Sequence, residues 1–274
     1  MSDLIAIQIN GSPSIAENLE KLDSLLGHAR PKPNSPALAV LPECAIQFAC
    51  CGATILENAE NMGQGPIQAR LANMAQKHNV YLVGGTMPIK SNDSAHYYAA
   101  SLVFSPAGKL ISAYNKIHLF DVEVQDKTQS YLESKFTQRG EHIATFDSPW
   151  GKVGQAICYD LRFATMFDAM MPMNIVVIPS AFTKATGQAH WHALLKARSI
   201  ELQCYIVAAN QVGTHQDGRE TFGHSCIYSP WGELLSVIEN EEGWASARVD
   251  SARQLSIRKR MPMQSHKRER YKFE

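Results

Sequence analysis

Three residues far apart in the chain, Glu43, Lys116 and Cys158, have side chains that together could break an amide bond. A cysteine thiolate attacks a carbonyl carbon and holds the acyl group as a thioester. A glutamate can take the thiol proton and later activate water, and a lysine can stabilise an oxyanion. Each residue alone has a simpler interpretation, as a buried thiol or a surface charge. Only convergence at one site would make the three catalytic.

Each of these residues stands at the end of a predicted strand. The pairs are 37–41 with Glu43, 110–114 with Lys116, and 153–158 with Cys158. Because ligands of open α/β sheets collect at the carboxyl ends of strands, we expect the three side chains to meet. A helix is predicted from about 163 to 171, so free backbone N–H groups and the helix dipole should stabilise a thiolate at Cys158.

The rest of the chain alternates strands with helices, which predicts a layered α/β fold. Further strands are expected at 4–10, 80–84, 175–178 and 205–209, and helices from Ser14, from Pro66 to about His78, and at 189–202. Ser-Pro-x-Gly turns begin at Ser105, Ser148 and Ser229. No linker rich in Pro, Gly or Ser divides the sequence, so we expect a single domain over 1–274 with two sheets and helices outside them.

The overall charge excludes classes of protein that bind through a strong electric field. Lys plus Arg and Asp plus Glu both number 26, which does not favour nucleic-acid or membrane binding. One basic stretch, about 253–274, is interpreted as a tail packed at a dimer interface rather than an RNA contact, because no aromatic stacking platform accompanies it. Six cysteines in a long chain without a signal peptide predict reduced thiols and a cytoplasmic location.

A metal site is one alternative, since Cys44, Cys50, Cys51, His190 and His192 carry donor atoms. The spacing lacks the paired CxxC motifs of zinc sites. A second alternative keeps the fold and discards catalysis, leaving an inactive scaffold. Reaction of Cys158 with a thiol probe would separate a scaffold from an enzyme, because a non-catalytic buried cysteine should be inert.

Three sequence blocks resemble the signature blocks of the nitrilase, or carbon-nitrogen hydrolase, superfamily. They are Leu41-Pro-Glu43, Tyr114-Asn-Lys116-Ile-His-Leu-Phe-Asp121 and Cys158-Tyr-Asp-Leu-Arg-Phe163. Matching segments at 179–182, 186–191, 197–198 and 223–225 extend the resemblance over nearly the whole chain. Two departures stand behind the nucleophile: Ala164-Thr165 replaces the usual Pro-Glu, and the segment 170–174 looks shortened.

The resemblance implies a fold, a mechanism and an assembly. The fold is an αββα sandwich that forms four layers, and the assembly is a homodimer. Glu43, Lys116 and Cys158 correspond to the Glu-Lys-Cys triad, and Glu133 to a second glutamate that positions it. The activity is hydrolysis of a small carboxamide through a thioester, with the oxyanion held by Lys116 and the backbone N–H of Tyr159, without a metal or organic cofactor.

The resemblance also points to a substrate class. Arg162, Phe182 and Thr186 match positions that contact ligand in the branch of deaminated glutathione amidase and omega-amidase, where an arginine can grip a carboxylate with two hydrogen bonds. Segments 195–205 and 208–215 look closer to deaminated glutathione amidase. The expected substrate is therefore an amide of a small 2-oxo acid. An ion pair of Arg162 with Asp160 or Glu201 is the structural alternative.

Overall fold

Two β-sheets form the centre of the computed structural model, which describes residues 3–30, 34–124, 126, 128 and 130–268. The first sheet has seven strands, in the order β17 (Gly243–Ala247), β1 (Leu4–Gln8), β2 (Ala37–Val40), β3 (Val80–Val83), β5 (Tyr97–Phe104) and β4 (Met87–Lys90), with β6 (Leu110–Asn115) also paired to β5. The second has six, in the order β16 (Leu234–Ile238), β15 (Ser225–Tyr228), β12 (Tyr205–Asn210), β11 (Ile175–Ser180), β10 (Gly151–Gln155) and β9 (Thr145–Ser148).

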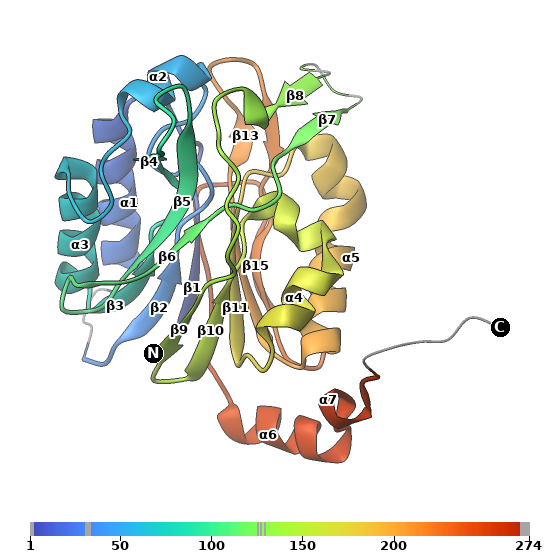
Figure 1. The fold of residues 1–274 in the computed structure, drawn as a ribbon. Helices are drawn as coiled ribbons and strands as arrows, with labels where there is room; N and C mark the ends of the chain where they lie inside the picture. The colour runs from blue at the N-terminus through green and yellow to red at the C-terminus, as the bar shows by residue number, and fades with distance from the viewer. Residues whose placement is uncertain (1–2, 31–33, 125, 127, 129, 269–274) are drawn as a thin grey trace.

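Helices cover the outer face of each sheet (Figure 1). The first sheet carries α1 (Ile15–Ala29) and α3 (Pro66–Lys77), and the second carries α4 (Ala164–Met170) and α5 (Lys184–Leu202). Short elements complete the described chain: the helices α2 (Gly52–Glu57), α6 (Ser251–Arg260) and α7 (Met263–His266), the 3-10 turns η1 (Glu133–Lys135) and η2 (Cys158–Arg162), and the hairpins β7 (Asp121–Glu123) with β8 (Ser130–Leu132) and β13 (Val212–Thr214) with β14 (Glu220–Phe222).

The alternation of side chains along the central strands explains why two sheets stack. In β1, Leu4 and Ala6 lie in the core between the sheets, whereas Ile5 and Ile7 lie in the core beneath the helices of the first sheet. Successive strand residues point to opposite faces, so a strand that is apolar on both faces must be covered on both. The result is the αββα sandwich that the sequence predicted.

Helix starts follow local capping chemistry. The hydroxyl of Ser14 accepts a 3.3 Å hydrogen bond from Glu17 N, so α1 begins where expected. Helix α5 begins at Lys184, five residues earlier than predicted, because Thr183 caps it through Thr186 N. Gly187 does not break this helix. A Cβ atom there would lie 2.3 Å from Phe222, so the residue is glycine because β14 packs closely.

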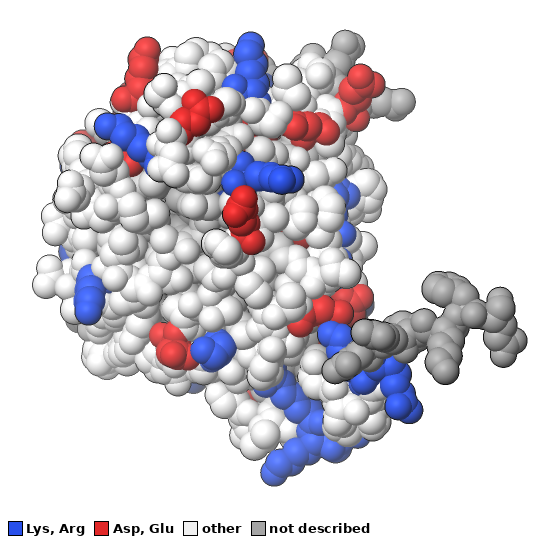
Figure 2. Space-filling view, in the orientation of Figure 1, with Lys and Arg blue, Asp and Glu red and all other residues white. Residues whose placement is uncertain are grey.

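The C-terminal basic segment forms α6 and α7 below the sandwich, where its Lys and Arg side chains gather (Figures 1 and 2). Gln254 in α6 is buried and donates to the carbonyls of Asn174 and Gln203, and Arg258 donates to Gln203 and Met173. These contacts tie α6 to the second sheet. The part of the predicted tail from 269 to 274 lies outside the described residues, and its place at a dimer interface stays a prediction. In the described chain, no helix combines the length and apolarity needed to cross a membrane.

Candidate active site

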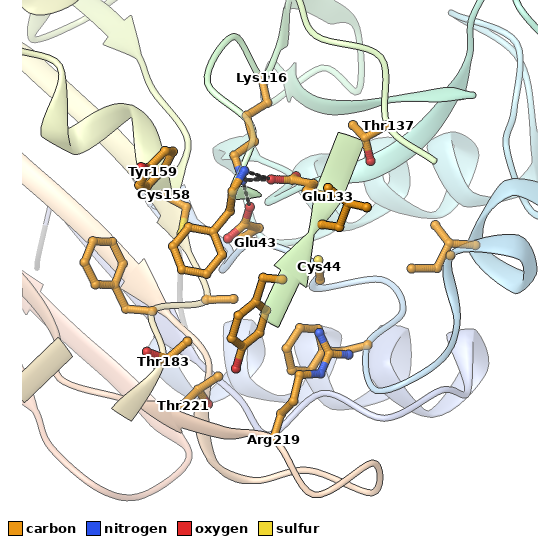
Figure 3. Close-up of a pocket in the computed structure, with 18 of the residues that line it drawn as sticks. Glu43, Cys44, Lys116, Glu133, Thr137, Cys158, Tyr159, Thr183, Arg219 and Thr221 are labelled. Carbon is orange, nitrogen blue, oxygen red and sulfur yellow. Dashed lines mark hydrogen bonds and ion pairs between the residues drawn. The ribbon is translucent and has the colours of Figure 1, made fainter. Parts of the chain in front are cut away.

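The side chain of Lys116 lies between two carboxylates. Its Nζ is 2.7 Å from Glu43 Oε1 and 2.8 and 3.1 Å from the two oxygens of Glu133 (Figure 3). Lys116 is 2% exposed, and burial alone would lower its pKa. The charges of Glu133 and Glu43 outweigh burial and raise the pKa well above its ordinary value. Lys116 is therefore a fixed positive charge at neutral pH.

Glu133 reaches Lys116 from the 3-10 turn η1. Its carboxylate also accepts a 2.7 Å hydrogen bond from the backbone N–H of Phe120. Burial raises the pKa of Glu133, and the charge of Lys116 lowers it. Since the ammonium and the backbone donor both bind the carboxylate, Glu133 fixes the position of Lys116 within the site.

Cys158 begins η2 with a φ of 47°, in the left-handed region that residues other than glycine adopt rarely. Burial raises the pKa of its thiol well above the ordinary value, and the charge of Glu43, its hydrogen-bond partner, raises it further. Lys116 and a backbone hydrogen bond from Ala181 offset this only in part. The stabilisation of a thiolate that the sequence led us to expect from the turn is outweighed by burial. Cys158 is therefore a thiol at neutral pH, with the Glu43 carboxylate as its hydrogen-bond partner.

Asp160 organises the backbone around this site, although sequence analysis gave it no such part. It is fully buried, and its carboxylate accepts hydrogen bonds from Tyr114 Oη at 2.7 Å, Ile157 N at 2.8 Å and His118 N at 3.1 Å. Tyr114 and His118 flank Lys116, and Ile157 precedes Cys158. One carboxylate thus holds together the two segments that carry the lysine and the cysteine.

A cavity of about 320 Å³ opens beside Cys158. All of the residues predicted for the site line it: Glu43, Lys116, Glu133, Cys158, Tyr159, Arg162, Phe182 and Thr186. The guanidinium of Arg162 lies 5.4 Å from the centroid of the Phe182 ring and 5.8 Å from that of Tyr159. These distances fit stacking of a cation on aromatic faces.

The interpretation of Arg162 as part of a structural ion pair is wrong. Asp160 binds the groups named above, and Glu201 pairs with Arg198 at 2.5 Å. Among the described residues, the polar contact of Arg162 is with His190 Nδ1 at 3.2 Å. Its guanidinium is therefore available to an anion in the cavity.

One wall of the cavity was not predicted from the sequence. Arg219 and Thr221, from the β13–β14 hairpin, and Cys44 and Phe48, from the loop after β2, also line it. Asp217-Gly218 was a signal for a tight turn, and Gly218 has a φ of 84° there. No local pattern reveals that this hairpin lies against a loop 170 residues earlier, because only the stacking of the two sheets brings them together.

The departures from the family pattern lie in helix α4 and directly after it. Helix α4 begins at Ala164 directly after η2, and the Phe163 ring stacks on His118 at 3.7 Å. Of the five side chains considered as metal donors (Cys44, Cys50, Cys51, His190 and His192), His192 is hydrogen-bonded to Tyr228 and His224. In the described chain, no three His, Cys, Asp or Glu side chains come together as a metal site requires.

Comparisons with known proteins agree with this geometry. The carbon-nitrogen hydrolase family model matches residues 5–259. The chain is 34% identical over 270 residues to deaminated glutathione amidase of Yersinia enterocolitica, covering 97% of this chain and 93% of that one. It is also 34% identical to omega-amidase NIT2 of Xenopus tropicalis, covering 97% and 94%. The crystal structure of Nit3 from Saccharomyces cerevisiae, a member of branch 10 of the nitrilase superfamily, superposes with a TM-score of 0.85 at 29% identity, covering 98% and 96%. The chain therefore belongs to the carbon-nitrogen hydrolase family and is a hydrolase of carbon-nitrogen bonds.

Proposed function

We propose that this enzyme hydrolyses an amide of a small 2-oxo acid, with Cys158 as nucleophile and deaminated glutathione as the preferred substrate. In that compound the side-chain carboxyl of 2-oxoglutarate is joined by an amide bond to Cys-Gly. The observation that supports the proposal most is the convergence of Glu43, Lys116 and Glu133 beside Cys158, in a cavity that also contains Arg162.

Acylation begins with transfer of the thiol proton from Cys158 to Glu43. The sulfur attacks the amide carbon, and a carbon–sulfur bond forms while the carbonyl electrons move onto oxygen. Lys116 and the backbone N–H of Tyr159 stabilise that oxyanion. The carbon–nitrogen bond then breaks as Glu43 gives its proton to the departing amine, which leaves a thioester on Cys158.

Deacylation reverses these roles with water. Glu43 takes a proton from a water molecule, whose oxygen attacks the thioester carbon, and the carbon–sulfur bond breaks. The proton returns to the sulfur and the 2-oxo acid is released. A fixed charge at Lys116 suits both steps, because each passes through an oxyanion at the same place. Glu133 acts by positioning Lys116.

The substrate class rests on Arg162 and on similarity. Arg162 supplies a guanidinium for the carboxylate of the 2-oxo acid, while Phe182 and Thr186 shape the wall beside it. Two relatives that match nearly the full chain, from Yersinia enterocolitica and Dictyostelium discoideum, carry the name deaminated glutathione amidase at 34% and 36% identity. Omega-amidase activity on 2-oxoglutaramate is the second candidate, because relatives with that name reach 34%.

One assay separates these candidates by the amine that leaves. Purified enzyme is offered deaminated glutathione, 2-oxoglutaramate and 2-oxosuccinamate, and Cys-Gly, ammonia and 2-oxo acid are measured. We expect the highest kcat/KM for deaminated glutathione, with one Cys-Gly per 2-oxoglutarate. A preference for 2-oxoglutaramate would favour omega-amidase. Turnover of none of the three would refute the proposed substrate class.

We also propose that the enzyme works as a homodimer in the cytoplasm. Two apolar side chains support the assembly, Ile200 on α5 and Trp231 in the neighbouring turn, which are 38% and 52% exposed. All six cysteines are free thiols, as suits a reducing compartment. Light scattering of the purified protein, with Trp231→Ser as the interface variant, and cell fractionation test these two points.

A further inference from the structure

We propose that Arg219 forms a second carboxylate subsite in the cavity, which binds the C-terminal carboxylate of the departing Cys-Gly. This inference rests on the proposed function and specifies the part of the substrate on the amine side of the scissile bond. Deaminated glutathione carries a carboxylate at both ends, so a second cation in the cavity would favour it over amides that carry only one.

The cavity offers four cationic side chains. Lys116 is occupied by Glu43 and Glu133, and Arg162 is assigned above to the 2-oxo acid. Lys135 is exposed and lies against the Phe136 ring at 5.4 Å, so its ammonium is surrounded by water. A well hydrated, flexible charge contributes little to binding. Arg219 remains as the cation suited to a second carboxylate.

Two contacts hold the guanidinium of Arg219 in place, an ion pair at its edge and an aromatic ring against its face. Its Nε donates to Asp217 Oδ2 at 2.6 Å, and its centre lies 4.4 Å from the centroid of the Phe48 ring. The Phe48 ring in turn packs edge-on against His215 at 4.4 Å. A cation that is already ordered loses little entropy when it binds. In the described chain Asp217 is the only ion-pair partner of Arg219 and engages Nε, which leaves the terminal nitrogens to grip a carboxylate.

The two arginines occupy separate parts of the cavity wall. Arg162 stands on η2 next to Tyr159 and Phe182, whereas Arg219 stands on the β13–β14 hairpin next to Phe48. In Figure 3 Arg219 enters the cavity from the side opposite to Lys116. The cavity volume of about 320 Å³ lies within the range of pockets that hold ligands of drug size. This volume is larger than 2-oxoglutaramate requires. The additional space fits a dipeptide amine.

The test compares deaminated glutathione with its C-terminal carboxamide, which differs only in lacking the distal charge. For the wild-type enzyme, we expect kcat/KM, measured by release of 2-oxoglutarate, to be about ten- to a hundredfold higher for the carboxylate. In Arg219→Gln this ratio should fall to about one. Lys184→Gln is the matched control, because Lys184 is an exposed cation that pairs with Glu220 nearby at 3.3 Å but does not line the cavity. It should keep the wild-type ratio.

Several outcomes would overturn the subsite. These are a wild-type ratio near one, a ratio that survives in Arg219→Gln, or a ratio that collapses in Lys135→Gln instead. Calorimetry adds a test without turnover: Cys-Gly should bind Cys158→Ala at least tenfold more tightly than it binds Cys158→Ala with Arg219→Gln, and equal affinities would refute the subsite. Failure of the proposed function looks different, since the wild-type enzyme would then release no 2-oxoglutarate from either compound.

Discussion

The hydroxyl of Tyr114 donates a 2.7 Å hydrogen bond to the carboxylate of Asp160, and this contact joins the strand that leads to Lys116 to the turn that begins at Cys158. Asp160 is fully buried and also accepts a hydrogen bond from Ile157 N. If the Tyr114 hydroxyl were removed, water could not replace it as a donor to this carboxylate. The distance between lysine and cysteine therefore depends on a carboxylate that touches neither. A group of this kind positions the reacting residues rather than taking part in the reaction.

Removing the Tyr114 hydroxyl should affect both stability and turnover. Tyr114→Phe deletes the hydrogen bond to the buried carboxylate of Asp160 and the acceptor of a 3.3 Å bond from Ile117 N. We expect a loss of about 1.5–3 kcal/mol in the free energy of unfolding, measured with denaturant. We also expect kcat to fall more than KM changes, because the alignment of Lys116 with Cys158 loosens. Tyr228→Phe is the control: it removes a hydroxyl bonded to His192, neither residue lines the cavity, and kcat should be unchanged. Wild-type kcat in Tyr114→Phe would show that the contact is purely structural.

Replacing Cys158, the proposed nucleophile, should abolish turnover without unfolding the protein. Cys158→Ala removes the sulfur that forms the thioester, so neither 2-oxo acid nor amine should be released above the background rate. The matched control is Cys226→Ala, which removes a fully buried thiol from the same apolar cluster and should remain active. Both variants should retain the wild-type circular dichroism spectrum. Amidase activity in purified Cys158→Ala would eliminate Cys158 as nucleophile.

The sequence predicted those helices and strands whose start or core position depends on neighbouring residues in the chain. Ser14 caps α1 and Pro66 opens α3 as expected, and the apolar runs became the central strands. The start of α5 was missed, because Thr186-Gly187 resembles a break and the closeness of Phe222, which explains the glycine, is a tertiary fact.

The sequence predicted the ionisable residues at the centre of the site, but not all of the residues that form the cavity wall. Carboxyl ends of strands bring Glu43, Lys116 and Cys158 together, as the order of elements required. The protonation of Cys158 could not be predicted, because it depends on how deeply the packed sheets bury it. Arg219 escaped notice for the same reason, since its hairpin approaches Phe48 only in the folded chain.

Buried thiols outside the site should make the protein sensitive to alkaline pH. Burial raises the pKa of Cys204 from 9.0 to about 12. The unfolded chain therefore loses this proton first, so the thiol's stabilising contribution is intact below pH 9 and is lost as pH rises toward 12. Each such thiol should lower the free energy of unfolding by about 1.4 kcal/mol per pH unit in that window.

Cys204→Ala should remove one such contribution. Under reducing conditions, the free energy of unfolding is measured with denaturant between about pH 9.5 and 10.5. It should fall with pH less steeply in Cys204→Ala than in wild type, by about 1.4 kcal/mol per pH unit. Cys51→Ala is the control, because Cys51 is exposed and its pKa is lowered rather than raised. Identical slopes in Cys204→Ala and wild type would contradict the assignment, whatever the stability of the variant at pH 7.

The last prediction concerns the guanidinium of Arg162. It lies against the rings of Phe182 and Tyr159 and faces the cavity, a geometry that a lysine cannot reproduce because its ammonium is neither planar nor able to form two parallel hydrogen bonds. Arg162→Lys should therefore lose about 1.5–3 kcal/mol of transition-state binding for a carboxylated 2-oxo amide, which is roughly ten- to a hundredfold in kcat/KM. A neutral amide has no carboxylate to lose, so its kcat/KM should change little.

Measuring kcat/KM for both amides in a matched pair of variants shows whether Arg162 binds the substrate carboxylate or only stabilises η2. Arg198→Lys is the comparison, because Arg198 donates to the carbonyl of Leu161 in η2 and pairs with Glu201, outside the cavity. Its loss should distort η2 and slow both amides by the same factor. Arg162→Lys should slow only the carboxylated one. If Arg162→Lys instead slows both amides equally, Arg162 supports the turn as Arg198 does, and the choice of a 2-oxo acid as substrate loses its main physical argument.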